Sequence, residues 1–187
     1  MSVQQPALAG LKVVEFAVFA AGPMVGKHLG EHGAQVVHVE SRSRPDGFRM
    51  HYPPYKDNQP GLNRTGTFAI FNDSKLSVAL NLKTPRGVEL AKELATWADV
   101  LIENFVPGVM ERLGLGYDAI AQINPSIIYL SSCNMGQTGP KVASAALVLS
   151  SRHRADSRTS PVIRAVSRCC CLVRTLILSP SVLAWWR

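Results

Sequence analysis

The sequence predicts an α/β fold built on a doubly wound parallel sheet. Short runs rich in Val and Ile alternate along the chain with segments whose apolar residues recur at helical spacing. Near the N-terminus a strand, a turn, a helix and a second strand follow within about 30 residues, which is the repeating unit of a parallel sheet. The 187 residues are 47% hydrophobic and 18% charged, a composition that suffices for one globular core.

The first unit covers residues 11–40. The β-branched run LKVVEF at residues 11–16 predicts a strand, and AAGP at residues 20–23 interrupts it. Residues 24–33 place apolar side chains at helical spacing and end on Gly33, a typical helix stop. The run AQVVHVE at residues 34–40 predicts the second strand.

The middle of the body begins with a loop. Residues 41–66 are rich in Pro, Gly and Asn and predict an extended functional loop. Residues 75–82 (KLSVALNL) predict a third strand. A helix over residues 85–98 follows, with Thr84 as its N-cap, Pro85 at its first position and one apolar face.

The last elements place the carboxyl edge of the sheet. Strands are predicted at residues 99–105 (DVLIENF) and 126–132 (SIIYLSS), with short helices at 109–113 and 117–122 between them. Ligands of doubly wound folds lie at the carboxyl ends of the strands. In this chain those ends are residues 16–22, 40–42, 80–83, 103–106 and 131–136.

The composition changes at residue 141. Residues 141–187 contain eight Lys or Arg, one acid and no glycine, whereas residues 1–140 contain twelve basic and twelve acidic side chains and all 14 glycines. The sequence therefore predicts a body, residues 1–140, and an atypical basic tail, residues 141–187. We hypothesise that the tail is out of frame or disordered; the alternative is a genuine basic arm. Its Arg residues are scattered among Val, Leu and Cys, so no nucleic-acid partner is predicted.

The spacing of the cysteines and the length of the apolar runs indicate the cellular compartment. Three of the four cysteines are adjacent at residues 169–171 and Cys133 stands apart, so neither a disulfide framework nor a metal site is predicted. No basic segment followed by an apolar run opens the chain, and no apolar run approaches the roughly 20 residues of a membrane span. We expect a cytoplasmic protein with no membrane partner.

Three local motifs invite a more specific interpretation. HLGEH at residues 28–32 puts two His side chains on one helix face, but its Glu is not at the zincin position, and we interpret it as a solvated or half-buried face. Cys133 follows a strand end with no His nearby in sequence, and we interpret it as a small buried residue. AAGP lacks the dinucleotide fingerprint, although its small residues let a ligand approach the backbone.

Basic side chains near the strand ends indicate one class of ligand. Arg42, Lys83 and Arg112 are the cations nearest to the strand ends or to the loops that follow them. Three cations that converge on one sheet edge suit a ligand that carries phosphates. Spacing alone leaves open whether they converge or are separate surface charges.

Three signatures follow one another in order within residues 8–140. They are the EF…AGP turn at residues 15–23, LNLKTPRG at residues 80–87 and ADVLIENFVPGVMERLG at residues 98–114. With these signatures the chain resembles the N-terminal region of the family III CoA-transferases. This is the CaiB/BaiF group, which includes formyl-CoA transferase and the α-methylacyl-CoA racemases.

The resemblance implies a fold and a reaction. The fold is a Rossmann-like large domain, of which residues 1–140 would be the incomplete N-terminal half. Complete members move CoA from an acyl-CoA to a carboxylic acid through an Asp-linked intermediate, and two chains interlock as a homodimer. Coenzyme A or acyl-CoA is implied as the bound substrate, with no metal. A racemase-like member of the same family, or a non-catalytic CoA-binding module, remains an alternative.

The resemblance also implies individual CoA contacts. Ala20 and Ala21 would line the pantetheine and adenine region, and Ala20 stands where formyl-CoA transferase has Gln. The family often carries an Arg directly after the residue that corresponds to Glu40. In this chain Arg42 lies one position further along. The implied contacts are Ala20, Ala21, Arg42, Leu80, Asn81, Leu82, Lys83, Asn104, Phe105, Val106 and Arg112.

The family's nucleophilic Asp has no counterpart in this chain. Asp156 lies in RADSR, which matches nothing in the family's Asp segment. We therefore assign no catalytic residue, and we expect the chain to be inactive alone and to fold poorly.

Overall fold

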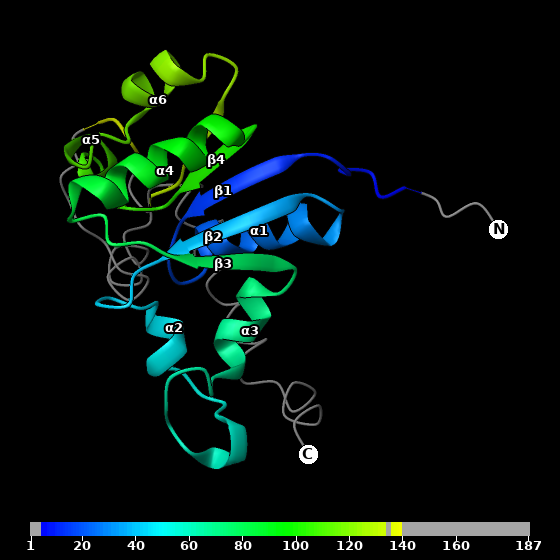
Figure 1. The fold of residues 1–187 in the computed structure, drawn as a ribbon. Coiled ribbons are helices and arrows are strands. Elements are labelled where there is room, and N and C mark those ends of the chain that lie inside the picture. The colour runs from blue at the N-terminus through cyan, green and yellow to red at the C-terminus, as the bar shows by residue number, and fades with distance from the viewer. Residues whose placement is uncertain (1–4, 134–135, 140–187) are drawn as a thin grey trace.

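The computed structural model describes residues 5–133 and 136–139, which form a sheet with helices on both faces (Figure 1). The sheet has five strands in the order β3-β2-β1-β4-β5, and all neighbouring strands are parallel. The predicted doubly wound α/β fold is thereby confirmed. The strands are β1 (Lys12–Phe16), β2 (Gln35–Glu40), β3 (Lys75–Ala79), β4 (Val100–Glu103) and β5 (Ile128–Ser131).

The helices divide between the two faces of the sheet. One face carries α1, which contacts β1, β2 and α3, and the other carries α4 and α6, which contact each other (Figure 1). The short helices α2 and η1 lie in the connection between β2 and α3. The helices are α1 (Ala21–Glu31), α2 (Gly47–Met50), η1 (Lys56–Asn58), α3 (Gly66–Asn72), α4 (Pro85–Trp97), α5 (Val109–Arg112) and α6 (Tyr117–Ile123).

The central strands are apolar along most of their length because both faces are covered. Val13 and Ile102 pack on the side of α1, whereas Val14 and Leu101 pack in the core beneath α4 and α6. All four side chains are fully buried. Successive side chains of a strand point to opposite faces, so a strand buried on both faces shows no polar alternation.

The first helix begins earlier than predicted. The structure starts α1 at Ala21, inside the AAGP motif that was expected to be a break. Pro23 lies in the first turn, where its missing N–H costs no helical hydrogen bond. Gly22 is needed for close packing, because a Cβ there would meet the side chains of Ala17 and Asn104.

The prediction of one extended loop over residues 41–66 is wrong in part. The segment contains α2 and η1, and α3 begins at Gly66, where no helix was predicted. The Thr65 side chain caps α3 by accepting a hydrogen bond from the Phe68 N–H. Phe71 of α3 stacks on Phe48 with ring centroids 5.2 Å apart. A helix of seven residues is too short to be recognised by its periodicity, and packing stabilises it.

The other predicted elements are present, with ends that coincide or differ by up to three residues. Thr84 caps α4 by accepting a hydrogen bond from the Gly87 N–H, and Pro85 opens the helix, as predicted. The predicted boundary at residue 140 and the tail, residues 141–187, lie outside the described residues. Within the described part of the chain no helix is long and apolar enough to cross a membrane.

Candidate functional site

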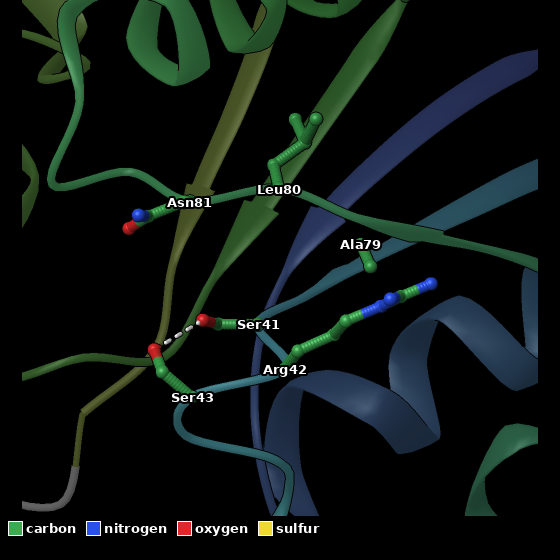
Figure 2. Close-up of a pocket in the computed structure, with 6 residues that line it drawn as sticks. All are labelled: Ser41, Arg42, Ser43, Ala79, Leu80 and Asn81. Carbon is green, nitrogen blue, oxygen red and sulfur yellow. Dashed lines mark hydrogen bonds between the residues drawn. The ribbon is translucent and has the colours of Figure 1, made fainter.

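A pocket of about 200 Å³ opens at the carboxyl ends of β2 and β3. Figure 2 shows its lining, with Ser41, Arg42 and Ser43 following β2, and Ala79, Leu80 and Asn81 at the end of β3 and directly after it. The hydroxyls of Ser41 and Ser43 lie 3.0 Å apart and hydrogen bond to each other. Arg42 is exposed and extends from the loop across Ala79 (Figure 2). Three of the residues implied by the resemblance, Arg42, Leu80 and Asn81, therefore lie together.

The turn between β3 and α4 forms the second wall. The Asn81 side chain accepts a hydrogen bond from the Lys83 N–H, and its main-chain carbonyl accepts from the N–H and the hydroxyl of Thr84. A Cβ at Gly87 would overlap the Asn81 carbonyl, so this turn requires glycine there. Leu82 packs against the core, and Lys83 is exposed. The local hydrogen bonds fix the backbone of this turn, which carries the exposed Lys83 at the end of β3.

The loop between β1 and α1 is held from two sides. Asn104, directly after β4, accepts a hydrogen bond from the Val18 N–H at 2.9 Å and donates one to the Val18 carbonyl at 2.7 Å. Asp46 accepts a hydrogen bond from the next N–H, that of Phe19, at 2.8 Å. Phe19 has a φ of 62°, a left-handed conformation that costs energy for a residue with a side chain. These contacts set the position of Ala20 and Ala21 at the start of α1.

The remaining predicted residues follow β4. Phe105 packs against the core, and its N–H donates a hydrogen bond to the Glu103 carboxylate at 2.8 Å. Val106 is exposed, and Arg112 is the exposed last residue of α5. In Figure 1, α5 lies on the side to which the strand arrowheads point. Arg112 thus belongs to the carboxyl edge but is not among the residues that line the pocket.

A chain of charged side chains lies beneath this edge, on the face covered by α1. Lys75 contacts both carboxylate oxygens of Glu15 at 3.0 Å, and Glu15 contacts Nδ1 of His38 at 2.6 Å. Nε2 of His38 lies 3.3 Å from Glu40, and Arg49 donates two hydrogen bonds of 2.7 Å to the same carboxylate. We call these five residues, Lys75, Glu15, His38, Glu40 and Arg49, the ion chain. Glu40 directly precedes the pocket residue Ser41.

The ion chain shifts the protonation of its members. Burial alone would lower the pKa of His38, but the carboxylates of Glu15 and Glu40 outweigh it and raise the pKa above 6.5. Burial alone would raise the pKa of Glu40, but His38 and Arg49 lower it to about 2. Burial lowers the pKa of Lys75, opposed by the charge of Glu15. The imidazolium form of His38 is therefore stabilised between two carboxylates.

Several of these residues were not recognised from the sequence. Ser41 and Ser43 flank the predicted Arg42; Ser41 lies inside the predicted strand end, residues 40–42, without having been named as a contact, and Ser43 lies one position beyond it. Glu15 and His38 stand inside apolar strand runs, which is the signal of a buried polar cluster. Asp46 carries no such signal, because nothing local to it indicates a bond to the Phe19 N–H.

Two other motifs considered in the sequence are the HLGEH segment and Cys133. His28 contacts Glu31 on the exposed face of α1, and Nδ1 of His32 lies 2.7 Å from the His28 carbonyl. Cys133 is half-buried and carries a free thiol. In residues 5–133 and 136–139, no group of three or more His, Cys, Asp or Glu side chains could hold a metal ion.

Sequence comparisons relate the chain to one family. The sequence profile of CoA-transferase family III matches residues 8–150. The chain is 41% identical over 134 residues to the succinyl-CoA:glutarate CoA-transferase of Mus musculus, which covers 71% of this chain and 29% of that relative. It is 41% identical over 133 residues to the beta subunit of the succinyl-CoA–L-malate CoA-transferase of Chloroflexus aurantiacus. That match covers 71% of this chain and 32% of the relative. The chain thus spans about a third of the length of these relatives.

Solved structures agree with the sequence comparison. The structure resembles a CaiB/BaiF family protein from Brucella suis with a TM-score of 0.74 and 29% sequence identity, over 97% of this chain and 51% of that one. It resembles a hypothetical protein from Mycobacterium tuberculosis with a TM-score of 0.72 and 29% identity, over 92% and 51% of the two chains.

Proposed function

The chain belongs to CoA-transferase family III, as the resemblance in its sequence indicated, and we propose from this premise that the carboxyl edge of its sheet binds coenzyme A or an acyl-CoA. The observation that carries the proposal is the pocket at the ends of β2 and β3, which is lined by Arg42, two serines and Asn81. Guanidinium and hydroxyl donors are the groups that bind phosphate oxygens.

The size of the pocket indicates that it binds one end of CoA rather than the whole molecule. Its volume of about 200 Å³ is below the roughly 300–1,000 Å³ of pockets that enclose a whole drug-sized ligand. We assign it to the phosphate-bearing nucleotide end of CoA, with Lys83 beside it on the β3–α4 turn. Ala20 and Ala21 would then line the path of the pantetheine along the strand ends, and Asn104, Phe105 and Val106 would border it from β4.

For the complete reaction we propose transfer of CoA from an acyl-CoA to a carboxylic acid through an Asp-linked intermediate. The names of the relatives pair succinyl-CoA with glutarate or L-malate, which supports a carboxylic acid as the acceptor. None of the described residues is assigned as the nucleophile. We further propose a cytoplasmic location, and an interlocked homodimer for complete members of the family. Light scattering coupled to size-exclusion chromatography tests the oligomeric state of this chain.

The binding proposal is tested with calorimetry of coenzyme A on the 187-residue protein. We expect Arg42→Ala, Lys83→Ala and Arg112→Ala each to weaken binding about tenfold, because a charge-assisted contact contributes about 1.5–3 kcal/mol. Arg86→Ala is the matched control, since Arg86 is exposed on α4 and pairs with Glu89. Unchanged dissociation constants in all three variants would remove these residues from the site.

The transfer proposal needs a separate assay. The protein is incubated with an acyl-CoA and a panel of dicarboxylic acids, and the new acyl-CoA is measured. Binding without exchange favours a CoA-binding module. Exchange favours a transferase and calls for a search for its nucleophile.

A further inference from the structure

The pocket segment, residues 41–45, lies between two anchored acidic residues. Within the segment the described hydrogen bonds are local: the Arg44 N–H donates to the Ser41 carbonyl, and the two serine hydroxyls bond to each other. At its C-terminal end, Asp46 accepts hydrogen bonds from the Phe19 and Phe48 N–H groups. The position of the pocket segment therefore depends on the contacts that hold Asp46 at one end and Glu40 at the other.

Glu40 is fixed through both its backbone and its side chain. Its carbonyl accepts a hydrogen bond of 2.8 Å from the N–H of Leu80, a residue on the opposite wall of the pocket. Its carboxylate receives the two parallel hydrogen bonds from Arg49, and the Arg49 guanidinium lies 3.6 Å from the centre of the Phe68 ring. Glu40 therefore joins the pocket to the ion chain.

His38 lies between two carboxylates. Its side chain is 1% exposed, Nδ1 faces Glu15 at 2.6 Å, and Nε2 faces Glu40 at 3.3 Å without a well-aligned hydrogen bond. A protonated imidazole carries an N–H on each nitrogen and attracts both carboxylates. A neutral ring that keeps its proton on the Glu15 side turns the lone pair of Nε2 toward Glu40. The lone pair and the Glu40 carboxylate are both negative, so they repel each other, and the repulsion displaces Glu40.

The charges around His38 balance when it is protonated. Glu15 faces it from β1, Lys75 lies behind Glu15 on β3, and Arg49 lies behind Glu40 on α2. Asp46, before α2, interacts with the charge of His38, and the Phe68 ring of α3 lies 6.3 Å away. The cations of the group are His38, Lys75 and Arg49, and its anions are Glu15, Glu40 and Asp46.

We propose that the ion chain anchors the pocket segment and that a proton on His38 is required to hold it in place, so that His38 is a positioning residue for ligand binding. The effect on CoA affinity rests on the proposed function, whereas the order of the pocket segment does not. Loss of the proton releases Glu40, loosens residues 41–45 and weakens the pocket, while the sheet remains folded.

The first experiment measures the segment without ligand. Amide hydrogen exchange of Arg44 and Leu80, whose N–H groups donate to the carbonyls of Ser41 and Glu40, is measured in the full 187-residue chain and corrected for intrinsic rates. It is compared at about pH 6, below the ordinary His value, and at about pH 9, because the pKa of His38 is raised above that ordinary value. We expect protection in the wild type to fall about fivefold or more at the higher pH, the lower end of typical coupling between sites. His38→Gln should show low protection at both values, and His38→Lys, which keeps a cation between the carboxylates, high protection at both.

Matched variants separate this effect from general destabilisation. His28→Gln removes an exposed His from α1 and should behave as the wild type. Arg49→Lys keeps the charge but loses the two parallel hydrogen bonds to Glu40, and should lower the protection of the Arg44 and Leu80 amides. If the His38 variants do not fold, the wild-type pH series and Arg49→Lys still decide: equal protection at both pH values, or no effect of Arg49→Lys, overturns the proposal.

The second experiment measures coenzyme A affinity by calorimetry at the same pH values. We expect the wild type to lose affinity at the higher pH relative to His38→Gln, which corrects for titration of the ligand's own phosphates. CoA binding with the same pH dependence in both proteins overturns the anchor and leaves the proposed function intact. Absence of CoA binding together with pH-dependent exchange at Arg44 and Leu80 overturns the proposed function and supports the anchor.

Discussion

At the scale of the residue, Asp46 connects two loops that are 27 positions apart in sequence. One carboxylate oxygen accepts a hydrogen bond from the Phe19 N–H and the other accepts one from the Phe48 N–H. The side chain is 1% exposed. Burial raises the pKa of Asp46, and the two N–H donors oppose that rise. The carboxylate stabilises the left-handed backbone at Phe19, which precedes the proposed CoA contacts.

We expect Asp46→Asn to lower the free energy of unfolding by about 1–3 kcal/mol, the cost of leaving a buried polar group unsatisfied. The amide has the same shape, but its NH₂ group must face one of the two N–H donors. Urea denaturation measures the change. Asp57→Asn is the control, because the Asp57 side chain is 66% exposed and its ion pair with Arg64 contributes little. Equal stability of the two variants would show that the Asp46 contacts are dispensable.

At the scale of the element, α1 shows how packing overrides helix propensity. Three glycines, Gly22, Gly26 and Gly30, lie inside this helix, where each is unfavourable relative to Ala. They let the helix approach the sheet: a Cβ at Gly26 would overlap the Glu15 carboxylate, and one at Gly30 would meet the Ser74 carbonyl at 2.6 Å. The close approach covers Glu15 and Lys75, two members of the ion chain.

We therefore expect Gly26→Ala to change the stability of the protein in the direction opposite to the one that helix propensity predicts. Propensity alone would stabilise the helix by about 1 kcal/mol. We expect a net loss of stability instead, because overpacking costs about 1–3 kcal/mol and displacement of Glu15 also disturbs its buried contacts with Lys75 and His38. Thermal unfolding measures the sign. A higher melting temperature in the variant would contradict the close approach of α1 to Glu15.

At the scale of the whole molecule, the fold combines a buried charged layer with apolar outer strands. The ion chain connects β1, β2, β3 and α2 on one face of the sheet. At the two edges of the sheet, Leu76 of β3 and Ile128 of β5 are 57% and 63% exposed. Exposed apolar side chains on edge strands favour association between molecules. Stability is therefore expected to depend on pH, and solubility on the sheet edges.

The acid side of the stability profile follows from Glu40. Its pKa is lowered from 4.5 to about 2 in the folded protein, so its contribution is fully present above 4.5 and is lost as the pH falls toward 2. A shift of that size corresponds to about 3 kcal/mol. We expect the stability difference between the wild type and Glu40→Gln, measured by urea denaturation, to shrink over this range. A difference that stays constant from pH 5 to about pH 2 would contradict the ion pair with Arg49.

The sequence by itself determined the family, the α/β class and the strands, because each is encoded in short windows. The alternation of β-branched runs and helical spacing, the Thr84–Pro85 helix start and the three signatures all lie within stretches of fewer than about 20 residues. Local conformational preferences and side-chain periodicity act over that range. The positions of the strand ends followed from the same patterns, and with them the location of the candidate site.

The tertiary structure alone decided which of those residues meet. Asn104 bonds to Val18 across 86 positions because β4 lies beside β1 in the sheet, and Lys75 of β3 bonds to Glu15 of β1 across 60 positions by reaching over β2. The helix α3 also depends on contacts with distant aromatic side chains rather than on its own seven residues. Pairing across a sheet brings together groups that no local window contains, so the ion chain and its link to the pocket became visible only in the folded molecule.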